Sequence, residues 1–143
     1  MELRDILSQH YQQSDQQGKN AFKVFLTAEL YLRQQKISQA GEQLSYFIDT
    51  YPDIDLIPLI TLRRALILLR LNQPELALKT AQAIEQTSLS DRSIILSGQI
   101  YEQVYNDKER ALEYFLRIIN DYPLSVFFEP IRYHIRQLRH IES

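Results

Sequence analysis

The side chains that could do chemistry in this sequence are few and scattered. There is no cysteine, which excludes disulfides, thiolate catalysis and cysteine-based metal sites. The three histidines are His10, His134 and His140, and the last two are six residues apart, so on a helix they point in roughly opposite directions. We therefore expect surface or half-buried histidines, with no metal site and no cofactor.

Catalytic motifs are also missing from the sequence. It has no glycine-rich phosphate loop, no His-Glu-x-x-His zinc motif and no Gly-x-Ser-x-Gly nucleophile turn, and only three glycines occur. The acid pairs Asp49/Asp53 and Asp107/Glu109 fall near expected helix ends, where capping explains them. The sequence therefore predicts a protein that is not an enzyme.

One basic stripe lies near the C-terminus, where Arg132, Arg136 and Arg139 recur at i, i+4 and i+7 and so share a helix face. Two interpretations stay open: the solvated outer face of a terminal helix, or a contact for an acidic partner. The net charge of −2 gives no electrostatic footprint for nucleic acid, which is therefore not an expected partner.

The elements that must position these side chains are helices nearly throughout. The 143 residues, 45% of them hydrophobic and 24% charged, suit one ordinary globular domain. Apolar periodicity predicts helices over residues 2–14, 21–35, 38–51, 55–71, 74–87, 90–104, 107–122 and 125–140, with a break in the Gln-rich stretch 12–20. The predicted helix caps are Ser38, Asp55, Ser90 and Asn106, and Pro130 predicts a kink or a later start for the last helix.

The most apolar stretch is not predicted to span a membrane. Residues 54–71 are interrupted by Asp55, Arg63, Arg64 and Arg70, so we expect a buried helix there. The charged N-terminus shows no export signal. The cytoplasm is therefore the default location, and export is the alternative if the chain is a fragment of a longer parent.

The helices repeat a pattern of small and bulky residues. Two strong copies and a weaker one are present: Ala28/Tyr31/Ala40/Tyr51-Pro52, Gly98/Tyr101/Ala111/Tyr122-Pro123, and Ala65/Leu68/Ala77. Such self-similarity is typical of helix pairs that stack on their neighbours, because no single pair can bury its own apolar face. The small residues let the two helices of a pair cross closely.

This pattern resembles the tetratricopeptide repeat family, since Gly98-x2-Tyr101, Ala111-x3-Phe115 and Pro123 occupy the slots of its motif. The resemblance implies a right-handed superhelical array of about three antiparallel helix pairs, over residues 21–54, 55–89 and 90–124. Helices 2–14 and 125–140 would flank it in a single domain, 1–143. The chain departs from the motif at Arg64 and Leu89, and by one extra residue between Gly98 and Ala111.

The resemblance further implies that the first helix of each pair lines a groove for a partner. The implied groove residues are Phe25, Glu29, Leu32 and Arg33 in the first pair, Leu62, Arg63, Leu66, Leu69 and Arg70 in the second, and Ile95, Gln99, Glu102 and Gln103 in the third. An apolar, partly acidic peptide or helix would suit such a groove. In the alternative, these leucines face neighbouring helices or a terminal segment.

The sequence thus predicts a non-enzymatic scaffold or adaptor for a protein or peptide of unknown identity. One branch of the family clamps C-terminal carboxylates, but Phe25 and Glu29 stand at the matching positions and disfavour that activity. The alternative function is a C-terminal structural or capping module of a larger repeat protein. Such a module would act in self-association, as a homo-oligomer, or in intramolecular packing, with no groove ligand.

Overall fold

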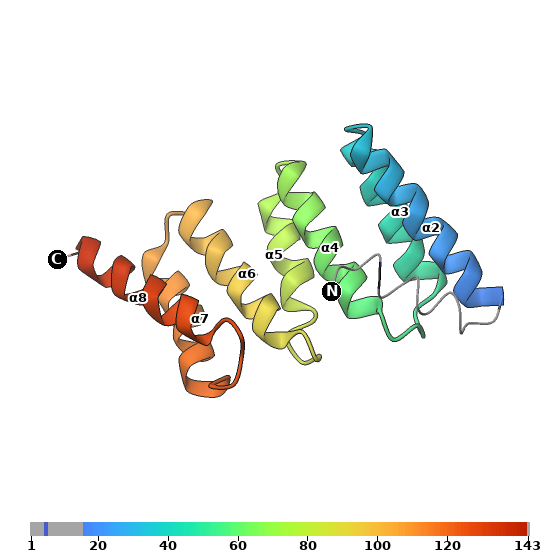
Figure 1. Cartoon of the computed structure of the whole chain (residues 1–143). Coiled ribbons are helices and arrows are strands. Elements are labelled where there is room, and N and C mark those ends of the chain that lie inside the picture. Colours follow the sequence, from blue (N-terminus) through green and yellow to red (C-terminus); the bar gives the residue numbers. More distant parts are fainter. Residues whose placement is uncertain (1–4, 6–15, 143) are drawn as a thin grey trace. The chain divides into compact units, whose positions relative to one another are not determined.

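The computed structural model describes residue 5 and residues 16–142, with side chains as far as residue 140. Every regular element in this part of the chain is a helix, which confirms the all-α prediction (Figure 1). The helices are α2 (Gln16–Arg33), α3 (Ile37–Thr50), α4 (Ile57–Arg70), α5 (Pro74–Gln82), α6 (Ser90–Gln103), α7 (Lys108–Asp121) and α8 (Phe128–Glu142). The predicted helix over residues 2–14 lies outside the described residues, apart from Asp5.

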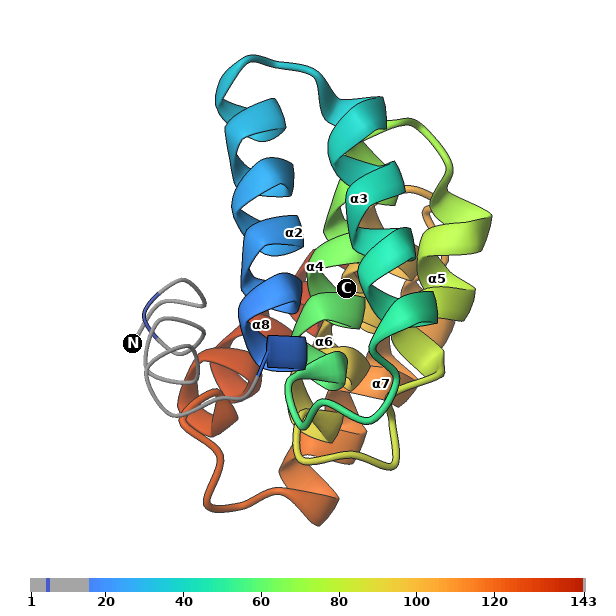
Figure 2. The ribbon, with the colours of Figure 1, turned by 90° about the vertical axis from the view of Figure 1, so that its right-hand side faces the viewer.

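The chain divides into two compact units, Met1–Ala77 and Leu78–Ser143. In the described part of unit 1, α2 packs along α3, and α3 packs against α4 (Figure 2). Its core contains Phe25, Leu44, Phe47 and Ile60, each at most 1% exposed.

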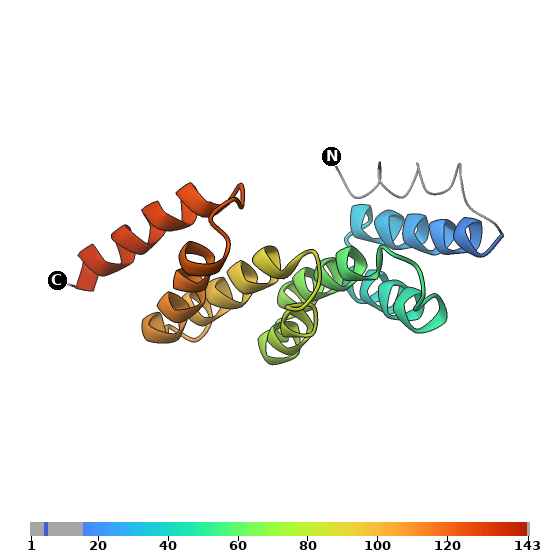
Figure 3. The ribbon, with the colours of Figure 1, turned by 90° about the horizontal axis from the view of Figure 1, so that it is seen from below.

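Unit 2 has a core of its own. In it α6 packs along α7, and α8 lies against α7 (Figure 3). Ile94, Phe115 and Ile118 are 0% exposed at the centre, and Ile135 of α8 joins them. Each unit therefore buries apolar surface locally, as stacked helix pairs do.

The small residues of the repeated pattern are buried, as the close-crossing argument requires. Ala28, Ala40, Ala65, Ala77 and Ala111 are all 0% exposed. In unit 2 the crossing is especially tight, because a Cβ added at Gly98 would lie 2.6 Å from Cε1 of Phe115. No larger side chain fits at this position of α6 without displacing the ring.

The turns inside the pairs share one device, a residue with left-handed backbone at Gln35, Asn72 and Asn106. In the first two turns the next residue donates its N–H to a carbonyl five positions back, Lys36 to Tyr31 (2.8 Å) and Gln73 to Leu68 (2.9 Å). In the third, Asp107 reaches Tyr101, six positions back, at 2.8 Å. The extra residue predicted in the third unit is therefore accommodated in this turn.

The predicted helix caps are wrong. Asp55 and Ser90 each lie one residue away from the observed N-cap, and Ser38 lies two residues away. The observed N-cap residues, Lys36, Leu56 and Leu89, make no side-chain capping bond. Asn106 has a left-handed backbone and lies in the turn before α7. The N-cap residue of α7 is Asp107, whose carboxylate accepts a hydrogen bond from the Arg110 N–H at 3.1 Å.

Two helix bounds also differ from prediction, and one is confirmed. α2 already begins at Gln16, inside the stretch predicted as a break, where the Gln16 side chain donates to the Asn20 amide oxygen at 2.9 Å. α5 ends at Gln82 instead of near residue 87, because hydrogen bonds from Ile84 to Ala81 and from Glu85 to Gln82 tighten the chain. α8 starts late, at Phe128, which puts Pro130 in its first turn as predicted.

The connections between successive pairs are copies of one loop, over residues 51–56, 84–89 and 122–127. In each, the fourth residue donates its N–H to the carbonyl of the first: Ile54 to Tyr51, Thr87 to Ile84 and Ser125 to Tyr122, at 3.3, 3.2 and 3.1 Å. In each, the sixth residue, Leu56, Leu89 or Phe127, accepts the first helical bond of the next helix. This shared register lets residues of α4, α6 and α8 be compared position by position.

Candidate binding surfaces

The first predicted groove segment forms a surface on α2 and α4 of unit 1, which we call the α2–α4 face. Arg63 joins the two helices, since its Nη2 donates to Oε1 of Glu29 at 2.7 Å. Arg70 donates to the side-chain oxygen of Gln35 at 3.4 Å, near the other end of the face. The face comprises Glu29, Leu32, Arg33, Leu62, Arg63, Leu66, Leu69 and Arg70, all exposed or half-buried.

One predicted groove residue of this set is buried. Phe25 is 1% exposed and packs in the core of unit 1, so it presents no surface to a partner. The register of the repeat placed Phe25 on the correct helix, but its large ring is the kind of side chain that a core recruits.

Leu66 is the most exposed apolar residue of the face, at 44%. Leu68, two residues further along α4, is only 7% exposed. Two residues that are two positions apart in an α-helix point to nearly opposite sides of it. The leucine at 66 therefore faces away from the side of α4 that Leu68 buries, and it is not needed for the core of unit 1.

The third predicted segment lies on α6 in unit 2. Gln99 and Gln103 are exposed, and Ile95 is half-buried against the unit 2 core. Glu102 is engaged by α8, since its Oε1 lies 2.6 Å from Nε2 of His134, whose ring also meets Phe115 edge-on at 5.2 Å. This segment therefore presents two exposed side-chain amides, Gln99 and Gln103, while the carboxylate of Glu102 contacts α8.

Arg63 and His134 occupy the same register position, seven residues after Leu56 and Phe127. Each binds a glutamate on an earlier first helix of its own unit, Glu29 or Glu102. His134, which the sequence could only assign to a surface or half-buried place, thus links α8 to α6.

The sequence did not predict an open depression in unit 1, where α3 and α4 meet the start of α5. Its volume is about 460 Å³. Arg64, the departure from the apolar motif, lies here, and its Nε donates to Oγ of Ser45 at 2.8 Å. Glu42, Tyr46 and Asp49 border it on α3, and their spacing of i, i+4 and i+7 is a signal that could have identified this face.

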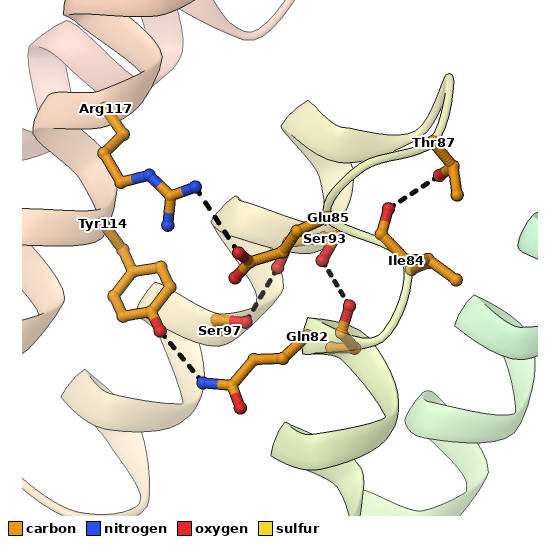
Figure 4. Close-up of polar contacts among 9 residues, drawn as sticks. Gln82, Ile84, Glu85, Thr87, Ser93, Ser97, Tyr114 and Arg117 are labelled. Carbon is orange, nitrogen blue, oxygen red and sulfur yellow. Dashed lines mark hydrogen bonds and ion pairs between the residues drawn. The ribbon is translucent and has the colours of Figure 1, made fainter.

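A polar cluster joins the end of α5 to α6 and α7 (Figure 4). The buried Ser93 donates its hydroxyl to the Ala81 carbonyl, and Ser97 donates to the Ser93 carbonyl at 3.0 Å. The Gln82 amide donates to the Tyr114 hydroxyl at 2.9 Å, and Arg117 lies 3.5 Å from Glu85. These bonds tie elements of unit 2 together and satisfy hydroxyls that burial removes from water.

The acidity of the Tyr114 hydroxyl in this cluster is altered by its surroundings. Burial raises the pKa of its hydroxyl above the usual value, while the hydrogen bond from Gln82 and the nearby Arg117 oppose that rise. The phenol therefore stays protonated at neutral pH and serves as a hydrogen-bonding partner between helices.

Among residue 5 and residues 16–142, no three histidine, aspartate or glutamate side chains cluster closely enough to hold a metal ion. Within the same residues, no helix combines the length and the apolar character that crossing a membrane requires.

Comparison with known proteins points to one family. No curated protein matches the chain. Residues 95–125, which cover most of α6, the following turn and α7, match the family model described as tetratricopeptide repeat. These are the residues that carry the Gly98, Ala111, Phe115 and Pro123 pattern, so the resemblance predicted from the sequence is confirmed for this segment. A tetratricopeptide repeat suggests, in general terms, a scaffold for protein interaction.

Proposed function

We propose that the protein is a non-enzymatic scaffold that binds a protein or peptide partner, with the α2–α4 face of unit 1 as its contact surface. The proposal rests on the exposure of Leu66. This apolar side chain is 44% exposed in the middle of the α2–α4 face, whereas the opposite side of α4 is buried in unit 1. The general assignment to protein-interaction repeats supports it.

The chemistry of the face suggests the kind of partner. Leu62 and Leu69 lie one turn to either side of Leu66, so a helix or extended peptide with two or three apolar side chains would extend this strip. Arg33 and Arg70 are exposed near one end, and an acidic residue on the partner would pair with them. We therefore propose an apolar, partly acidic segment as the ligand.

The test compares two leucines of similar exposure on different sides of unit 1. Leu66→Lys places a charge on the α2–α4 face, whereas Leu76→Lys makes the same change at a residue that is 41% exposed and borders the depression beside α3. We expect the wild type and the Leu76→Lys variant to capture partner proteins from the native cell, and the Leu66→Lys variant to lose them. With one such partner purified, Leu66→Lys should weaken binding at least tenfold, about 1.4 kcal/mol.

Circular dichroism of both variants provides the control for folding. Because both leucines are substantially exposed, each variant should keep the helical spectrum of the wild type. If every captured protein binds a folded Leu66→Lys variant as tightly as it binds the wild type, the α2–α4 face is not the contact surface.

A second function, a structural or capping module, is supported by α8. In the shared register Arg136 of α8 stands at the position of Gly98 in α6, where α7 crosses closely. An exposed arginine leaves no room for a helix packed as tightly as α7 is on α6. This role predicts that unit 2 makes contacts through its outer surface and that no partner depends on Leu66.

A further inference from the structure

The loop that connects α7 to α8 differs from its two internal copies in the residues that it shows to solvent. The third and fifth positions of the loop are exposed in all three copies. They are Asp53 and Asp55 in the first copy and Gln86 and Ser88 in the second. In the third they are Leu124 and Val126, which are 97% and 81% exposed.

Folding does not account for these two side chains. The backbone of the loop is the same in all three copies, so polar residues serve equally well at both positions. Leu124 and Val126 are almost fully exposed, and apolar side chains exposed two residues apart in one loop are the kind of surface that a partner covers.

The loop is also held in place before any contact is made. The Ser125 hydroxyl donates to Oδ2 of Asp91 in the first turn of α6 at 2.8 Å, and it accepts the Phe127 N–H at 3.1 Å. A partner therefore meets an ordered surface, which lowers the entropy cost of binding.

Two carboxylates and one cation lie beside the loop, since the Arg92 guanidinium stands 5.8 Å from the centre of the Phe127 ring. A depression of about 300 Å³ adjoins Leu124, and Asp91 and Asp121 are among the residues that line it. A surface that fits here should combine apolar or aromatic groups with cations.

The outer face of α8 in the same unit has that composition. Tyr133 is 64% exposed, and the arginines Arg132, Arg136 and Arg139 are all exposed on the helix beside it. In the shared register these arginines replace Thr61, Ala65 and Leu68 of α4, each of which is at most 9% exposed. The positions that are buried on α4 are thus open to solvent on α8. Arg132 pairs there with Glu129 at 2.7 Å, and Arg136 and Arg139 make the face basic.

We infer that the partner of this surface is a second copy of the chain. The Leu124/Val126 loop of one copy packs against Tyr133 of the other, and Asp121 of the first meets the arginines of the second. Since both patches belong to unit 2, a twofold axis pairs each loop with the opposite α8, and such a contact closes at a dimer. The inference is independent of the α2–α4 face.

Sedimentation equilibrium of the full chain from micromolar to near-millimolar concentration tests the inference. We expect the wild type to dimerise reversibly, and more weakly in high salt because the arginine–carboxylate pairs are screened. The double variant Leu124→Asp/Val126→Asp, which gives the loop the aspartates of its first copy, should dimerise at least tenfold more weakly. Both side chains are exposed, so its circular dichroism and melting should match those of the wild type.

Charge reversal identifies the arginine face as the opposite half of the contact. Arg136→Asp and Asp121→Arg should each weaken dimerisation, and the two together should restore most of it. Leu66→Lys is the matched control in unit 1 and should leave the dimer unchanged, which separates failure here from failure of the proposed ligand face. A wild type that stays monomeric at every concentration, or an aspartate variant that dimerises as well as the wild type, overturns the inference.

Discussion

At the scale of single residues, one missing methyl group decides how closely α6 and α7 pack. A Cβ at Gly98 would lie 2.6 Å from the Phe115 ring, and that ring is 0% exposed, so it has no free space to move into. Gly41 in α3 is the matched case, since a Cβ there would lie 3.3 Å from Cγ2 of Ile67, a branch methyl that would have to shift by only a few tenths of an ångström.

We therefore expect the same substitution to act in opposite directions at these two sites. Glycine to alanine inside a helix ordinarily stabilises by about 0.5–1 kcal/mol. Gly41→Ala should show this gain or no change, whereas Gly98→Ala should lower the free energy of unfolding by roughly 1–3 kcal/mol through overpacking. Urea denaturation followed by circular dichroism measures both. A Gly98→Ala variant as stable as Gly41→Ala would contradict the tight crossing.

The groove residues show what a sequence register can and cannot tell at this scale. Position in the repeat predicts Glu29, Arg63 and Leu66 for one groove, and in the structure Glu29 of α2 and Arg63 of α4 form an ion pair. It did not separate Phe25 from them, because both sides of a first helix carry apolar residues and only tertiary packing selects the buried one. It also missed the Glu102–His134 contact, which joins helices that are not sequential neighbours.

At the scale of elements, α7 has a side-chain cap at its N-terminus. Asp107 accepts a hydrogen bond from the Arg110 N–H, whereas Ser38, predicted to cap α3, lies inside that helix. Asp107→Ala should lower the free energy of unfolding by about 0.5–2 kcal/mol. Ser38→Ala should change it by less than about 0.5 kcal/mol.

Thermal unfolding monitored at the helical signal distinguishes the two variants. The charge of Asp107 also favours the N-terminus of α7, so Asp107→Asn, which keeps a capping oxygen, should recover a large part of the loss. Equal melting temperatures for Asp107→Ala and Ser38→Ala would show that the cap contributes nothing.

Helices were predicted well in this chain because apolar periodicity and proline carry the signal along each segment. α3 and α7 end immediately before Tyr51-Pro52 and Tyr122-Pro123, and α5 begins at Pro74, where the sequence placed them. Helix starts were predicted poorly for a physical reason. A capping residue must have the right backbone angles as well as the right side chain, and those angles are set by loops whose N-cap residues, such as Leu56, are fixed by burial.

At the scale of the whole molecule, each of the two units has a core of its own. Ile60 lies in the core of unit 1 and Ile118 in that of unit 2, and both are 0% exposed. In helical-repeat proteins most stabilising contacts are made within a pair or with the next pair, so a local loss of packing need not be felt throughout the chain.

The last prediction uses a matched pair of substitutions, Ile60→Val and Ile118→Val. Each removes one buried methylene and should cost about 0.5–1.5 kcal/mol. Followed by native-state hydrogen exchange, Ile60→Val should speed exchange in α2, α3 and α4 roughly two- to tenfold, and Ile118→Val should do the same in α6, α7 and α8. In each variant the other unit should exchange at the wild-type rate. If either substitution speeds exchange equally in both units, the two cores open together, and the chain behaves as one cooperative domain.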